Sequence, residues 1–102
     1  MDSLTIKTMK NKEVIRNFLN NCEAINHHGS LRSTGDRLFS YNTCIAQLVD
    51  DIIWVNVSRY STTTSGHRNS LISACKVYCF ETRFVENVPI NTQRLWKETE
   101  KI

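Results

Sequence analysis

The chain has 102 residues and a formal net charge of +3, from 13 basic and 10 acidic side chains. This length is typical of one domain with a modest core, so we expect a single domain over residues 1–102. No apolar run reaches the roughly 18 residues that span a bilayer, and the N-terminus lacks the apolar core of a secretory signal. We therefore expect a cytoplasmic protein with no membrane partner. The pI near 8.8 and the scattered basic residues do not favour direct nucleic-acid binding.

The N-terminal third predicts a helix that Asn11 can cap and that ends near Gly29, because glycine favours the left-handed C-terminal position. Apolar residues recur in it at steps of three and four: Val14, Ile15, Phe18, Leu19, Cys22 and Ile25. Residues 29–37 then predict a loop. Arg32 and Arg37 make this loop the most basic exposed segment. It is either a solvated connection or a contact loop held by a rigid scaffold.

Residues 38–67 predict the centre of the fold, a β-hairpin followed by the start of a helix. Residues 41–49 and 52–60 are rich in β-branched and aromatic residues. Asp50 and Asp51 lie between these two strands and suit a two-residue turn, because aspartate tolerates the positive φ that such turns require.

The predicted turn also sets a register for the hairpin, because side chains alternate across a strand. One face would carry three facing pairs of core residues: Leu48 with Ile53, Ala46 with Val55, and Cys44 with Val57. The opposite face would be mostly polar, with Ile45 and Trp54 as its apolar members. Trp54 is thus available to a further strand or to a partner.

The last third predicts a second helix and a possible strand. Residues 61–65 offer hydroxyl caps for a helix with apolar positions at Leu71, Ile72, Cys75, Tyr78 and Cys79. Residues 80–88 alternate loosely and could form a strand, which Pro89 ends. Asn91 or Thr92 can cap a last helix whose apolar anchors are Leu95, Trp96 and Ile102.

Together these elements predict a small α+β domain. Its centre is an antiparallel β-hairpin or short sheet with helices on one face, in the order α-β-β-α, followed by the possible strand and the C-terminal helix. Candidate partner-binding residues are the most basic loop residues and the two tryptophans, because aromatic residues and arginine dominate binding hot spots. These candidates are Arg32, Arg37, Trp54 and Trp96.

The four cysteines and three histidines are candidate zinc ligands, although the usual paired two-residue cysteine spacings are absent. In the predicted topology, the end of the first helix lies beside the first strand and the start of the second helix. The ligands that could converge there are Cys22, His27 or His28, Cys44 and His67. Cys75 and Cys79 lie further along the second helix and would need another site or another chain. The alternative is that the cysteines fill the core and the histidines lie on the surface, with His67 tying down the threonine-rich turn.

Enzymatic chemistry has little support in the sequence. The chain has only three glycines, none spaced to form a phosphate-binding loop. Asp50 and Asp51 are adjacent in a turn and should point apart, so they do not form an acid/base pair. Every cysteine lies on a predicted apolar face, where thiols are usually inert. We therefore expect no enzyme.

Two motifs carry a resemblance to a known group of proteins. SYNTCIAQ and, after an apolar strand, RYSTTTSGHRN resemble a family of small proteins encoded by phages and prophages, over residues 38–71. The chain departs from the family pattern at Gly66, where a basic residue is commoner. It also resembles zinc-containing anti-CRISPR proteins of streptococcal prophages, which inhibit the type II RNA-guided nuclease.

That resemblance implies a binding inhibitor in the host cytoplasm, which occupies the bacterial type II CRISPR effector nuclease and blocks target DNA loading or cleavage. It also implies a structural zinc, which would stabilise a small domain with a limited core. The alternative function is a small phage nucleic-acid-binding or regulatory protein without enzymatic activity.

Overall fold

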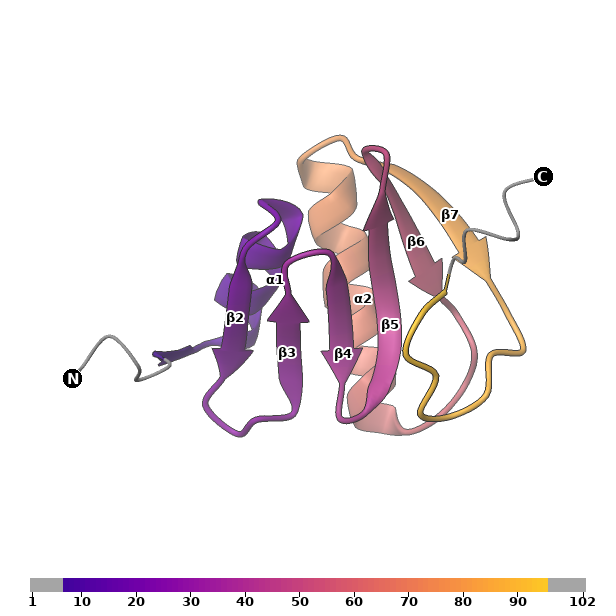
Figure 1. Ribbon diagram of the computed structural model, residues 1–102, viewed down its shortest axis with the longest axis horizontal. Coiled ribbons are helices and arrows are strands. Elements are labelled where there is room, and N and C mark those ends of the chain that lie inside the picture. Colours follow the sequence, from indigo (N-terminus) through magenta and orange to yellow (C-terminus); the bar gives the residue numbers. More distant parts are fainter. Residues whose placement is uncertain (1–6, 96–102) are drawn as a thin grey trace.

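The computed structural model describes residues 7–95, which form one twisted sheet with two helices behind it (Figure 1). The strands lie side by side in chain order. They are β1 (Thr8–Met9), β2 (Glu23–Asn26), β3 (Leu31–Thr34), β4 (Arg37–Ser40), β5 (Thr43–Val49), β6 (Ile52–Asn56) and β7 (Glu81–Val85). The helices are α1 (Asn11–Leu19) and α2 (Thr62–Val77). The outer pairs, β1 with β2 and β6 with β7, are parallel, and the pairs between them are antiparallel.

The predicted α-β-β-α arrangement around a short hairpin is wrong, although the domain is α+β. The described residues form a seven-stranded mixed sheet, because residues 23–40 form strands where we expected a helix end and a loop. Asn21 adopts a left-handed conformation with φ of 61° and ends α1 soon after Leu19. Asparagine tolerates that conformation better than most residues, so the helix ends there and does not reach Gly29.

The predicted hairpin of β5 and β6 is confirmed, together with its turn. Asp50 and Asp51 adopt φ of 51° and 67°, as a two-residue hairpin turn requires. Ala46 lies opposite Val55 and Leu48 opposite Ile53, which is the predicted register.

The predicted position of Cys44 in this hairpin is wrong. The β4–β5 register shifts, so that Leu38 pairs with Ala46 but Phe39 pairs with Cys44, and Ile45 is the extra residue of a β-bulge. The bulge turns Ile45 into the core and Cys44 to the other side of the sheet. Ile45 is 1% exposed and belongs to the main core cluster, whereas Cys44 is buried outside that cluster.

The core lies between the sheet and the two helices. Helix α1 buries Val14, Ile15, Phe18 and Leu19, because these positions share one face at helical spacing. Helix α2 contributes Leu71 and Cys75. The predicted start of α2 is confirmed, since the hydroxyl of Ser61 accepts a hydrogen bond from the Thr64 backbone amide at 3.2 Å. In the described part of the chain, neither helix combines the length and the apolar character needed to cross a bilayer.

The C-terminal part corrects one further prediction and confirms another. The possible strand in residues 80–88 is present as β7. Residues 86–95 then cross in front of the sheet without helical structure, and we call this segment the strap (Figure 1). The predicted last helix therefore does not begin at Asn91 or Thr92. Trp96 and Ile102, which were two of its anchors, lie outside the described residues.

Candidate functional site

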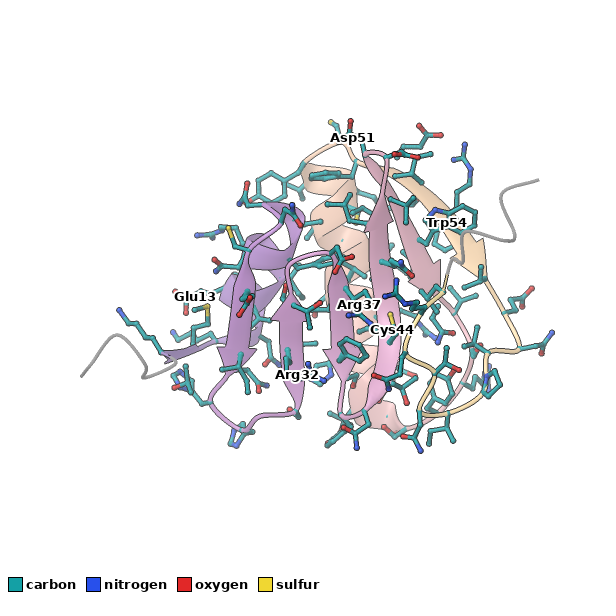
Figure 2. The ribbon with its side chains drawn as sticks, viewed as in Figure 1. Glu13, Arg32, Arg37, Cys44, Asp51 and Trp54 are labelled. Atoms are coloured by element: carbon teal, nitrogen blue, oxygen red, sulfur yellow. The ribbon has the colours of Figure 1, made fainter. Side chains whose placement is uncertain are left out.

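One face of the sheet carries three of the four candidate partner-binding residues that were predicted from the sequence. We call it the helix-free face, because both helices pack against the opposite side (Figure 1). Arg32 pairs with Phe39 across β3 and β4, and Arg37 pairs with Gln47, which in turn pairs with Trp54. Residues directly opposite each other in neighbouring strands point to the same side of a sheet. Figure 2 shows Arg32, Arg37 and Trp54 in front of these strands. Trp96, the fourth candidate, lies outside the described residues.

Two arginines lie over the ring of Phe39. The guanidinium carbon of Arg32 lies 4.5 Å from the ring centroid, and that of Arg37 lies 5.5 Å from it. Both distances are within the range of a cation–π interaction. Phe39 is only 2% exposed, so the ring is a fixed support for two partly buried cations. Both guanidinium groups are therefore positioned against the same buried ring.

Arg37 is further held by the strap and the neighbouring turn. Its Nη1 donates a hydrogen bond to the Gln93 carbonyl at 3.2 Å, and its Nε lies 3.7 Å from the Asp36 carboxylate. That Nε is buried and has no hydrogen-bond partner among the described residues. Burying a charged donor without an acceptor is costly. The nearby Asp36 carboxylate offsets part of that cost, so this pairing helps to hold the Arg37 side chain in place.

The strap covers the β5 and β6 part of the helix-free face. Its backbone is held by polar groups of the sheet strands and their loops. The Gln47 side chain accepts a hydrogen bond from the Leu95 amide at 2.8 Å, and the Cys44 amide donates to the Thr92 carbonyl at 2.7 Å. Tyr60 donates its hydroxyl to the Val88 carbonyl. Cys44 and Gln47 are buried where they bond to the strap. Arg32, labelled in Figure 2, lies on β3 outside the strap.

The two sequence motifs of the resemblance meet at one end of the sheet. Ser40, which begins the first motif, shares hydrogen bonds with His67 Nδ1 at 2.8 Å and with the Thr64 hydroxyl at 2.9 Å, both from the second motif. All three side chains are buried, and burial lowers the pKa of His67. The neutral imidazole and the two hydroxyls therefore tie α2 to β4. Beside them, an open cavity of about 440 Å³ is lined by Tyr41 and Tyr60, among others.

The candidate zinc ligands are not brought together. Cys22 is exposed after α1, where its thiol contacts the Asn20 carbonyl, and His27 is exposed and hydrogen-bonded to the Thr8 hydroxyl at 2.8 Å. Cys44 lies beneath the strap and His67 lies on the helix side of the sheet. Across residues 7–95, no three histidine, cysteine, aspartate or glutamate side chains lie where they could share a metal ion.

The remaining candidate ligands are also separate from one another. His28 is exposed in the turn between β2 and β3. Cys75 is buried in the core, whereas Cys79 is exposed just beyond α2, with a φ of 60°. Cys22, His27 and His28 do not approach the other candidate ligands because α1 ends early, at Leu19. The donors in the described residues are therefore not arranged as a zinc site, and the zinc stays a prediction.

The buried thiols are poor nucleophiles at neutral pH. Burial raises the pKa of Cys44 to about 12 and that of Cys75 to about 11. A thiol must lose its proton to attack or to bind a metal, so both stay protonated near pH 7.

Phe39 is the residue of this face that the sequence interpretation missed. It lies in the segment after the predicted loop, and the signal for it was present. Thr34 and Arg37 flank Gly35-Asp36, a pair that suits a two-residue hairpin turn, and Gly35 indeed adopts a φ of 108°. A hairpin there alternates Arg32 and Thr34 with Leu31 and Ser33, which places the basic residues on one face.

The fold and this face define a class: a small sheet domain with helices covering one side and stacked arginines on the other. The chain belongs to a family of unknown function (DUF8033), whose family model matches residues 4–84. No curated protein and no solved structure matches the chain. The family match reaches into β7, so the strap lies outside it.

Proposed function

We propose that this protein binds another macromolecule through the helix-free face and inhibits it by occupying it, with no chemistry of its own. The observation that carries this proposal is the pair of arginines held on the buried ring of Phe39. Arginine binds carboxylates and phosphates through parallel hydrogen bonds, and an arginine that is already oriented loses less entropy on binding. The partner surface should therefore be anionic.

The proposed partner is the type II RNA-guided nuclease of a bacterial host, bound in the host cytoplasm by a phage-encoded protein. The resemblance over residues 38–71 supports a phage origin, and the separate resemblance to anti-CRISPR proteins supports the nuclease as the partner. A nuclease loaded with guide RNA also presents the phosphates and carboxylates that a pair of arginines recognises. Bound there, the protein would block either the loading of target DNA or its cleavage.

A cleavage assay with the purified nuclease, guide RNA and target DNA tests this function. The wild-type protein should suppress cleavage, and the double variant Arg32→Glu/Arg37→Glu should lose most of that effect. The matched control is Lys12→Glu/Arg16→Glu, which changes the net charge equally but lies on the helix side of the sheet; it should inhibit as the wild type does. Circular dichroism would verify that each variant is folded. Undiminished cleavage at excess wild-type protein would remove the nuclease as the partner.

A second candidate function, direct binding of single-stranded nucleic acid, is favoured by the same face. Arg32 and Arg37 supply cations and Trp54 supplies an aromatic ring on the helix-free side, and single strands are bound by such combinations. Binding of labelled single-stranded DNA or RNA should then weaken steeply as salt rises, because phosphate contacts release counterions. An absence of binding at low salt would exclude this candidate and leave a protein partner.

Alkylation of the cysteine thiols tests whether the protein inhibits without a reaction of its own. We expect an alkylating reagent to modify Cys22 and Cys79 rapidly in the native protein and to leave Cys44 and Cys75 unmodified, because only the first two are exposed. Inhibition should survive this modification. If alkylation of the native protein abolished its effect on the nuclease, a cysteine-dependent activity would replace our proposal. Elemental analysis of protein purified without added zinc would test the predicted zinc.

A further inference from the structure

A second surface lies on the opposite side of the sheet, between the two helices. We call it the helix groove, a cavity of about 620 Å³ lined by residues that include Lys12, Ile15 and Arg16 of α1 and Ala74, Val77 and Tyr78 at the end of α2. We propose that the helix groove binds an acidic amphipathic segment of another protein.

Two large apolar side chains that line the groove are exposed to solvent. Val77 is 74% exposed and Tyr78 is 53% exposed, although the helical pattern had predicted Tyr78 as a core position. Ile15, which also lines the groove, is only 2% exposed and belongs to the hydrophobic core. Large apolar side chains gathered at the rim of a cavity favour an apolar anchor from a partner, since each excludes water when covered. Isolated exposed residues would carry no such meaning.

The charged residues of the groove favour a partner with negative charge. Lys12 and Arg16 both line the groove, and no acidic residue lines it with them. Within residues 7–95, the ion pairs join Arg37 with Asp36 and Arg83 with Glu81, so Lys12 and Arg16 have no carboxylate partner there. A segment with carboxylates beside its apolar anchors would supply the missing charge.

The apolar and basic residues together favour an acidic helix over a second copy of this chain or a nucleic acid as the molecule that binds in the groove. A second copy of this chain would bring its own Lys12 and Arg16 toward the same rim if the two grooves faced each other, and like charges would repel. A nucleic acid would satisfy the cations but would leave Val77 and Tyr78 in contact with a polar backbone. A helix that places apolar residues at steps of three and four, with carboxylates beside them, satisfies both parts of the groove.

A titration followed by nuclear magnetic resonance tests this proposal with the full chain. The probe is a synthetic helical peptide of about 15 residues, with leucines on one face and glutamates elsewhere. A second peptide carries lysine at each glutamate position. We expect the acidic peptide to shift the resonances of Ile15, Ala74 and Val77, and the lysine peptide to leave them unchanged.

Variants separate the charge from the shape of the groove. Lys12→Glu/Arg16→Glu should weaken binding of the acidic peptide at least tenfold, while Lys12→Arg/Arg16→Lys keeps it. The matched control, Arg32→Glu/Arg37→Glu, lies on the helix-free face and should bind the peptide as the wild type does. Equal binding of both peptides, shifts confined to the helix-free face, or no binding at all would overturn the proposal. Light scattering that showed a dimer lost in Lys12→Glu/Arg16→Glu would assign the groove to a second copy.

Discussion

The two sides of the sheet carry basic residues in different physical settings. On the helix-free face, Arg32 and Arg37 are held on a ring that is 2% exposed. In the helix groove, the cations Lys12 and Arg16 are exposed, and Val77 beside them is 74% exposed. The helix-free face thus holds its cations on a buried ring, whereas the groove combines an uncovered apolar surface with exposed cations. Equal charge on two surfaces does not imply the same kind of partner.

The largest expected effect is on the ring that supports the helix-free face. Phe39→Ala should lower the free energy of unfolding by about 3–5 kcal/mol, because it leaves a cavity beneath both arginines. Urea denaturation would measure it. Phe84, which is 56% exposed, offers a matched control, and Phe84→Ala should change stability by less than about 0.5 kcal/mol. Similar losses from both substitutions would contradict the description of Phe39 as a fixed support.

A smaller effect is expected at the contact that joins the helix layer to the sheet. Thr64→Val should lower the free energy of unfolding by about 1–3 kcal/mol, because it removes one partner of the buried Ser40 hydroxyl. Thr63→Val, one position earlier in α2 and exposed, is the control and should be nearly neutral. A neutral result for Thr64→Val would mean that this network contributes little to holding α2 in place.

The same contact predicts a pH dependence. Burial lowers the pKa of His67 below its ordinary 6.5, so below that pH the unfolded chain binds a proton that the folded chain does not. The free energy of unfolding should therefore fall as the pH drops below about 6.5, and level off once the pH passes the folded pKa. His67→Gln should flatten this part of the profile. Denaturation midpoints measured from about pH 7.5 to about pH 5 would test it, and identical profiles for both proteins would contradict it.

The smallest expected effect on stability is in the helix groove. Val77→Ser should change the free energy of unfolding by less than about 0.5 kcal/mol, because an exposed side chain contributes little to the fold. The same variant should weaken binding of the acidic peptide. A substantial loss of stability would show that Val77 packs in the fold and is not an open binding surface.

The sequence predicted correctly those parts of the fold that are determined by residues close to one another in the chain. The turn at Asp50 and Asp51, the register of Ala46 with Val55, and the cap at Ser61 all depend on neighbouring residues. The first helix was predicted too long because Cys22 and Ile25 continue its apolar spacing, while the left-handed Asn21 ends it. When apolar residues are spaced by three or four over only a few positions, the segment can still form a strand that pairs with residues far away in the chain.

The candidate site was predicted in part. Arg32, Arg37 and Trp54 were named from composition, and the structure places them on one face. Phe39 was missed, because the ring gains its role only when β3 and β4 pair. The zinc ligands were argued from a topology in which the first helix reaches His27, and the bulge at Ile45 further separates Cys44 from the helix side. A bulge adds one residue to a strand, which reverses the side chains beyond it and leaves no clear mark in the sequence.

Hydrogen exchange on the complex with the guide-loaded nuclease tests the central claim most directly, because it shows which surface becomes covered. We predict added protection in residues 31–40 of the helix-free face, which lie outside the strap, and none in α1 or in the second half of α2. Protection confined to the two helices, with exchange in β3 and β4 unchanged, would contradict it.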